Sequence, residues 1–430
     1  MSDFATFFSF SDPNIRYVVF GSILLTASSA IVGSFTFLKK KALVGDAVAH
    51  SILPGVCLAF LLSGTKNPIY LIMGAFATGW LSLVFVDIIS SKSKIKEDTA
   101  IGLVLSVFFG VGILLLTFIQ SSNNANQSGL DDFLFGQAAY LVGQDLIVFS
   151  VVALVLLAAV WLFFKEFTLI AFDEAYARAL GFPVRMLELI LTSLTVLAVV
   201  TGIQAVGAVL MAAILITPAA AARFWTNNIV KMLFLAAIFG AFSGLGGAYI
   251  SFTAPSMPTG PWIVVVVSSI AFFSFFFAPR KGIFHRIWLQ KTNRSKILDE
   301  NILKAFYQIG ETLRDFMEPK TTDEILEKRF FKKHELLSGL RRLRRQGFVE
   351  RKRNDAWQLT LAGKHKGQRV VKLHRLWELY LTKYLRIAPD HVHEDAETIE
   401  HILTPELEAQ LERLLNYPTI DPHQSEIPYR

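Results

Sequence analysis

The sequence predicts an all-α membrane domain of about nine spans, followed by a small α+β winged-helix domain that carries a helical metal-regulator module. The first observation is a division in charge. Of the chain's 42 basic and 35 acidic residues, the first 290 positions hold only 16 and 13, and the last 140 positions hold the other 26 and 22. The second is a series of apolar runs close to 20 residues long, the length that crosses a bilayer. The last 140 residues have the charge density of a soluble unit and are enough to bury a core.

The membrane domain is expected over residues 1–285. Its predicted spans are 15–38, 46–63, 69–90, 99–119, 144–165, 187–203, 205–225, 230–252 and 261–279. The 36 residues from 187 to 222 are too many for one crossing, so the run is divided near Gly202. Basic residues collect in alternate loops, as in 39–41 and 92–96, whereas loops 120–143 and 253–260 contain no Lys or Arg. This pattern places the N-terminus outside and the C-terminus in the cytoplasm.

Asp46 and His50 stand at the start of the second span, and no other histidine precedes His285. Residues four apart share one face of a helix. Ionisable groups inside a membrane are retained mainly where they function, and Asp with His binds divalent manganese, zinc or iron. Pro54 is expected to bend the same helix. The alternative is that Asp46 caps the helix and His50 makes one interhelical hydrogen bond; the membrane setting favours the metal site.

Residues 44–55, VGDAVAHSILPG, resemble the signature of ABC permeases that import manganese, zinc or iron. Similar stretches are KEDTAIG at 96–102, FLFG at 133–136, FDEAYARALG at 172–181, AVG at 205–207 and ITPAA at 216–220. The resemblance implies a homodimeric permease in a prokaryotic cell membrane, an ATPase as a separate cytoplasmic subunit, and an extracellular or periplasmic metal-binding protein. The chain contains no G-x-x-x-x-G-K-[ST] phosphate loop, which agrees with ATP hydrolysis on another subunit.

The segment 172–181 lies in an expected cytoplasmic loop and reads as a short amphipathic helix, with Pro183 preventing its continuation. The resemblance implies that it is the coupling helix, which docks on the ATPase. The expected coupling residues are Asp173, Glu174, Ala175, Arg178 and Gly181. The alternative is an ordinary interfacial helix. Asp87, near the end of the third span, is expected to be solvated.

Residues 286–362 read as a winged helix-turn-helix. The expected elements are a helix over 298–316, a second that begins at 321–324, a third over 334–346 and a hairpin over 348–361. The third helix carries Arg341, Arg342, Arg344 and Arg345, an arrangement that enters a DNA groove in free proteins. Because this unit is tethered to a membrane, we favour a solvated basic face, or one that contacts anionic lipid or the ATPase, over nucleic acid.

Residues 363–430 are expected to form a helical dimerisation and metal-sensor module. The predicted ligands are His374, Glu378, His393, Glu397, Glu400 and His401. This region resembles metal-dependent repressors of the diphtheria-toxin-repressor type, in which the position of Glu397 is cysteine in iron-responsive and glutamate in manganese-responsive members. The chain departs from that pattern at Asn301 and at Lys304, where a cation replaces a glutamate and would repel a metal ion.

Taken together, these features favour a permease subunit of a manganese-importing ABC transporter, not itself an enzyme, with a fused cytoplasmic sensor. A membrane-anchored, metal-responsive DNA-binding regulator is the main alternative, although one span would suffice as an anchor. A secondary transporter of the same ions is the third. The metal ion is the substrate and a regulator, with manganese preferred and zinc or iron open.

Overall fold

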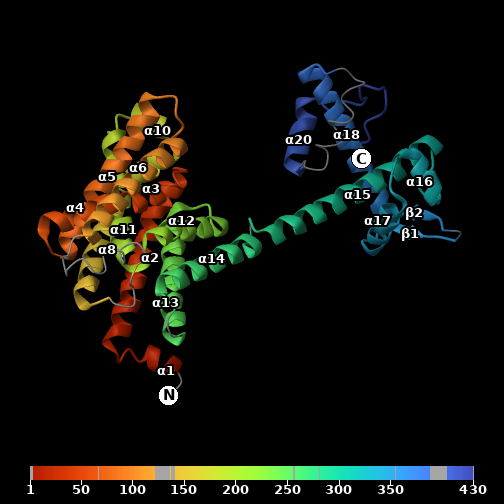
Figure 1. The fold of residues 1–430 in the computed structure, drawn as a ribbon. Coiled ribbons are helices and arrows are strands. Elements are labelled where there is room, and N and C mark those ends of the chain that lie inside the picture. The colour runs from red at the N-terminus through yellow and green to blue at the C-terminus, as the bar shows by residue number, and fades with distance from the viewer. Residues whose placement is uncertain are drawn as a thin grey trace. The chain divides into compact units, whose positions relative to one another are not determined.

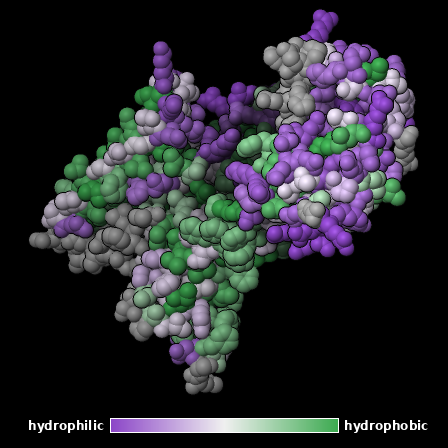
Figure 2. Space-filling model, turned by 90° about the vertical axis from the view of Figure 1, so that its right-hand side faces the viewer, coloured by the Kyte–Doolittle hydropathy of each residue, from purple (hydrophilic) through white to green (hydrophobic). Residues whose placement is uncertain are grey.

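The computed structural model describes residues 3–65, 67–121, 136, 141–254, 257–279, 281–353, 355–387 and 404–429. The chain forms two compact units, Met1–Arg286 and Ile287–Arg430 (Figure 1). Broad hydrophobic areas cover the first unit, here called the membrane unit, and hydrophilic residues cover most of the second (Figure 2).

The membrane unit is a bundle of helices. These are α1 (Asp3–Phe8), α2 (Pro13–Leu38), α3 (Val44–Ser51), α4 (Leu53–Ser63), α5 (Pro68–Lys92), α6 (Glu97–Ser121), α8 (Gly143–Leu162), α9 (Phe164–Phe172), α10 (Glu174–Ala179), α11 (Val184–Val206), α12 (Ala208–Trp225), α13 (Ile229–Thr253) and α14 (Thr259–Phe277). Within the described ranges, eight helical segments are long and apolar enough to cross a membrane, α3 and α4 together making one of them. The apolar part of α12, Leu210–Trp225, is shorter and takes the place of the remaining predicted span.

The boundary between α11 and α12 lies at Gly207, not at the predicted position near Gly202. Gly207 has φ +91, a backbone conformation that side-chain-bearing residues rarely adopt. Other backbone also lies close to this turn, since a Cβ on Gly136 would lie 2.3 Å from the nitrogen of Gly207. Gly202, by contrast, is a buried helical residue in α11. The helix therefore breaks at Gly207, the glycine that adopts the positive φ of the turn.

Helix α2 lies in the middle of the bundle and packs against α8, α11, α12 and α13 (Figure 1). Its closest neighbour is α13, and glycines make this approach possible. A Cβ on Gly240 would lie 2.6 Å from the carbonyl oxygen of Thr26, and one on Gly244 would lie 2.8 Å from the backbone of Ser22. The hydroxyl of Thr26 donates to the carbonyl oxygen of Gly240 at 2.7 Å. Small residues on α13 thus let the two helices approach closely, as is common in membrane bundles.

The second unit contains most of α15 (Ile283–Leu313), followed by α16 (Thr322–Lys328), α17 (Lys333–Arg345), β1 (Val349–Arg351), β2 (Trp357–Leu359), α18 (Leu361–Leu385) and α20 (Pro405–Leu414). The strands pair antiparallel with Val349 opposite Leu359. Thr321 and Glu324 form a capping box at the start of α16. Three helices and a hairpin thus form the predicted winged helix, except that α15 begins well before the expected residue 298.

Two apolar clusters hold the second unit together. One lies inside the winged helix and includes Ile302, Phe306, Leu340 and Trp357. The other joins α18 to α20 and the C-terminal segment through Leu376, Leu411, Leu415 and Ile427.

Candidate functional site

Helix α3 carries the predicted transport pair and is packed among α5, α6, α11 and α12. Its small residues allow this, because Ala47 and Ala49 are fully buried and a Cβ on Gly45 would lie 3.1 Å from the Leu215 side chain of α12. Asp46 and His50 are the two positions of α3 that keep partial exposure. The helix is thus embedded on most sides, with its two ionisable residues on the remaining face.

Asp46 and His50 contact each other. The Nε2 atom of His50 lies 3.5 Å from Oδ1 of Asp46, and the two side chains are 22% and 43% exposed, respectively. The edge of the His50 ring also meets Phe109 of α6, with ring centroids 5.4 Å apart and planes at 89°. Asp46 has no basic partner other than His50 among the described residues. The carboxylate and imidazole therefore point toward one another and remain accessible.

The helix that bears this pair is broken directly after it. Ser51 ends α3, Leu53 begins α4, and Ile52 lies between them. Pro54 has no N–H, so the carbonyl of His50 lacks its helical i+4 donor. The hydroxyl of Thr78 on α5 lies 3.4 Å from the carbonyl oxygen of Ile52, which supports the backbone at the break. The expected bend at Pro54 is present, and it leaves backbone oxygen next to the pair.

This arrangement offers one carboxylate and one imidazole to a divalent cation. Within the described residues, no three His, Cys, Asp or Glu side chains cluster in a way that could hold a metal ion. Cys57, on the following turn of α4, is fully buried. A bound ion would therefore take its remaining ligands from water, hydroxyl or carbonyl oxygen, or from another chain.

The predicted coupling segment forms α10. The Asp173 side chain accepts a hydrogen bond from the backbone nitrogen of Tyr176 at 2.9 Å and so caps the helix. Glu174 forms an ion pair with Arg178, Ala175 is exposed, and Gly181 follows with φ +84. Phe172, Tyr176 and Leu180, spaced four apart, are 61%, 55% and 53% exposed. The segment presents an apolar and charged surface away from the bundle.

The basic helix of the winged helix is α17. Its Arg342 is used internally, since its guanidinium donates to Asp299 at 2.8 and 3.2 Å. Burial raises the pKa of Asp299, and the bond from Arg342 counteracts that rise. Arg341, Arg344 and Arg345 line a surface pocket together with Arg351 of β1. Three of the four predicted arginines thus form a basic surface.

Only two of the six predicted sensor ligands lie within the described residues. His374 and Glu378 on α18 are buried, with Nε2 and Oε1 3.0 Å apart. His423, which we did not predict as a ligand, places its Nε2 atom 4.0 Å from the same Glu378 oxygen. The other predicted ligands, His393, Glu397, Glu400 and His401, lie outside the described residues.

The described part of this module does not make up a complete metal site. Helices α15 and α18 lie side by side, since a Cβ on Gly367 would lie 2.8 Å from the carbonyl oxygen of Leu303. On α15, the Asn301 amide oxygen is buried and has no hydrogen-bond partner among the described residues, which suits a ligand, but Lys304 is only 1% exposed. A buried ammonium group opposes a divalent cation nearby.

One buried polar pair in the membrane unit was missed from the sequence. Asp145 is 8% exposed, and its Oδ1 accepts a hydrogen bond from the Gln204 side chain of α11 at 2.9 Å. Its Oδ2 accepts from the backbone nitrogen of Val142 at 3.0 Å, which caps α8. An Asp at the start of an apolar run resembles any helix cap, so only the contact with α11 distinguishes it. These bonds account for Asp145 structurally.

Two family models match the chain, one in each of its two units. The model of the ABC 3 transport family matches residues 11–278, and that of the iron dependent repressor, metal binding and dimerisation domain matches residues 360–429. The manganese transport system membrane protein MntC of Bacillus subtilis (strain 168) is 43% identical over 376 residues, which cover 87% of this chain and 86% of that protein. The zinc transport system membrane protein TroC of Treponema pallidum (strain Nichols) is 42% identical over 291 residues, 68% of this chain and 97% of that protein.

Among solved structures, PsaBC from Streptococcus pneumoniae in complex with Fab contains a chain that is 34% identical. The match has a TM-score of 0.58 and covers 65% of this chain and 97% of that one.

Proposed function

The chain belongs to the ABC 3 transport family, and from that premise we propose that it is the permease subunit of an importer that moves divalent metal ions, manganese in particular, into the cytoplasm. It is a bacterial cell-membrane protein, as its apolar helices and its permease relatives indicate. The match over residues 11–278 favours transport over the membrane-anchored regulator, because it covers the whole set of spans and not a single anchor.

The observation that carries the proposal is the contact between Asp46 and His50 on α3. A carboxylate beside an imidazole within a membrane span is unfavourable unless a partner compensates for lost hydration. A divalent ion supplies that compensation each time it passes. The partial exposure of both side chains suits an ion that must enter and leave.

The ligand types of the pair are compatible with manganese. The pair offers a carboxylate oxygen, which suits harder ions such as manganese, and an imidazole nitrogen, without a thiolate. One relative is named for manganese transport and another for zinc transport, and both metals accept this ligand pair. Measuring the metal content of the purified complex, with competition between manganese, zinc and iron, tests the preference.

The complex requires other subunits. We infer that a separate ATPase docks on α10, since Phe172, Tyr176 and Leu180 form an exposed apolar row beside charged Glu174 and Arg178. An extracellular or periplasmic protein would deliver the metal, and two copies of this chain would form the permease in contact with membrane lipid. Co-purification with an ATPase supports this assignment. Co-purification with a specific operator fragment would instead support the regulator, and metal uptake without any nucleotide-binding partner would support a secondary transporter.

Removing either member of the pair tests the transport site. Cells that express Asp46→Ala or His50→Ala should lose manganese accumulation while the complex still assembles. Asp323→Ala and His334→Ala remove the same chemical groups from exposed positions of the second unit and should leave accumulation unchanged. Normal uptake by both pore variants would reject the site.

We further propose that the second unit regulates transport in response to metal. The match to the metal binding and dimerisation domain and the buried pair His374–Glu378 support this, whereas Lys304 opposes metal binding. Removal of residues 290–430 should weaken inhibition of uptake by high internal manganese. Equal inhibition without the unit would show that it is a structural or docking element. Lys304→Glu should raise the metal content of the full complex if the predicted ligands are used.

A further inference from the structure

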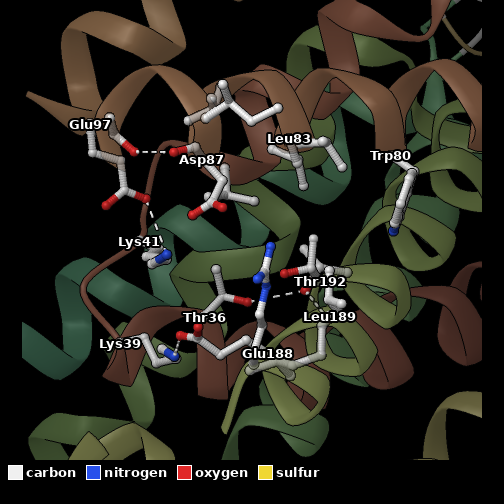
Figure 3. Close-up of a pocket in the computed structure, with 18 residues that line it drawn as sticks. Thr36, Lys39, Lys41, Trp80, Leu83, Asp87, Glu97, Glu188, Leu189 and Thr192 are labelled. Atoms are coloured by element: carbon white, nitrogen blue, oxygen red, sulfur yellow. Dashed lines mark hydrogen bonds and ion pairs between the residues drawn. The ribbon is translucent and has the colours of Figure 1, made fainter. Parts of the chain in front are cut away.

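A cavity of about 400 Å³ lies at the start of α3, the helix that carries the transport pair, among helix ends that the basic loops place in the cytoplasm. The last turn of α2, the start of α3, the end of α5, the start of α6 and the first part of α11 surround it (Figure 3). Val44, the first residue of α3, lines the cavity. At a rise of 1.5 Å per residue, Asp46 lies about 3 Å and His50 about 9 Å beyond Val44 along the axis of α3. The cavity therefore lies at the cytoplasmic end of the helix that carries the pair.

The charges on the cavity wall balance. Its basic residues are Lys39, Lys41 and Arg185, and its acidic residues are Asp87, Glu97 and Glu188. Two of the three carboxylates are already engaged, since Lys39 pairs with Glu188 and Lys41 lies 3.3 Å from Glu97 (Figure 3). Asp87 forms no ion pair with any residue that the structure describes. Asp87 is thus the one carboxylate of the wall outside these two ion pairs, and Arg185 is the one cation outside them, in a wall that is neutral overall.

The cavity also continues toward the predicted ATPase-docking segment. A second pocket shares Asp87, Arg185 and Glu188 with it and reaches Arg178 of α10. Arg178 of α10 thus lies next to the charged wall of the cavity.

We propose that this cavity is the exit chamber for the transported divalent cation, with Asp87 as the carboxylate that receives the ion after it leaves Asp46 and His50. Lys39 and Lys41 hold Glu188 and Glu97 in ion pairs, so that the ion meets one free carboxylate and not three. A site on a conduction path must attract the ion yet bind it weakly enough for release. The inference rests on the proposed function, since it assigns the next position on the same path.

The test compares two lysines of one loop. Lys41→Gln frees Glu97, whereas Lys40→Gln removes the same charge from an exposed side chain that does not line the cavity. The full complex of permease, ATPase and binding protein is reconstituted in vesicles, loaded with manganese, rinsed with a chelator and assayed for retained metal and for uptake rate. A second free carboxylate near a doubly charged ion should raise retention by Lys41→Gln at least about threefold and slow uptake correspondingly. Lys40→Gln should behave as the unmodified complex.

Asp87→Asn should lower the uptake rate by itself and abolish the added retention when combined with Lys41→Gln. Equal retention by Lys41→Gln and Lys40→Gln, or added retention that survives Asp87→Asn, would overturn the exit chamber. The unmodified complex and Asp46→Ala, measured alongside, separate this failure from a failure of the proposed function. If Asp46→Ala abolishes uptake while the cavity variants have no effect, only the exit chamber is rejected.

Discussion

Gly55→Ala tests whether close helix packing supports the transport site. Gly55 follows Pro54 on α4 and faces α5. A Cβ at this position would lie 2.0 Å from the carbonyl oxygen of Gly74 and 2.3 Å from the hydroxyl of Thr78. Because the nearest atom belongs to the backbone, a side-chain rotation does not relieve the clash. The two helices must separate, and the contact between Thr78 and the carbonyl of Ile52 separates with them.

The size of the effect follows from these distances. Ordinary van der Waals contact begins at 3.4 Å, and a Cβ on Gly55 would lie 2.0 Å from the carbonyl oxygen of Gly74, so these two atoms must separate by roughly 1.4 Å. Overpacking of this kind destabilises a core by about 1–3 kcal/mol. Alanine's better helix propensity returns at most about 1 kcal/mol. Because the clash is with backbone, the upper end of the overpacking range applies, and we therefore expect a net loss of about 2 kcal/mol. Manganese uptake should also fall, because the displaced segment supports the break next to His50.

Thermal unfolding of the purified complex, followed by tryptophan fluorescence, measures the first effect, and vesicle uptake measures the second. Gly110→Ala is the matched control, since a Cβ on Gly110 of α6 would have no atom of the described residues within 4 Å. If Gly55→Ala unfolds at the temperature of Gly110→Ala and imports manganese at the same rate, the argument from packing at α4 and α5 is wrong.

Two further predictions concern the second unit, each followed by hydrogen exchange of the full chain. Burial disfavours ionised Glu408, but Lys372 and Arg369 lower its pKa overall. A carboxylate with a lowered pKa stabilises the fold above the unfolded pKa of about 4.3, and this stabilisation is lost on acidification. Amides of α20 should therefore lose protection below about pH 4, whereas those of α17 should not. Arg342→Ala removes the ion pair of Asp299, whose pKa burial already raises. Without Arg342 the buried carboxylate is tolerated when protonated but is unfavourable when ionised, so the variant should be destabilised by about 1–3 kcal/mol at pH 7 and by less at pH 4. An equal loss of stability at both pH values would contradict this role of the Arg342–Asp299 pair.

The positions of the spans follow from the length of apolar runs, because each span must bury its backbone within itself. The run predicted at 230–252 forms α13, Ile229–Thr253. The division of 187–222 was misplaced because two glycines occur in this region and run length does not distinguish them. The position of the break depends on tertiary packing, since Gly207 takes φ +91 beside the backbone of Gly136.

The candidate site divides in the same way between local and distant contacts. The approach of His50 to Asp46 follows from i, i+4 spacing, which helical geometry alone determines. The support from Thr78 and the close approach of Gly74 come from α5, and no local pattern identifies them. The compensated charges of the cavity have the same origin, because Lys41 and Glu97 belong to segments that meet only after folding.

The chain contains two described His–acid pairs at i, i+4 spacing, and their surroundings suit opposite roles. Asp46 and His50 keep 43% and 22% of their side chains exposed and have no lysine or arginine partner within the described residues. His374 and Glu378 keep 4% and 3%, in a unit that also buries Lys304. An ion that is released in every cycle requires access and a wall that does not repel it, which the first pair provides. The second pair is enclosed, so any metal there would exchange only when α18 moves relative to its neighbours. These surroundings support our proposal that the transported ion passes the membrane pair, and they favour slow, retained binding for any metal at the second pair.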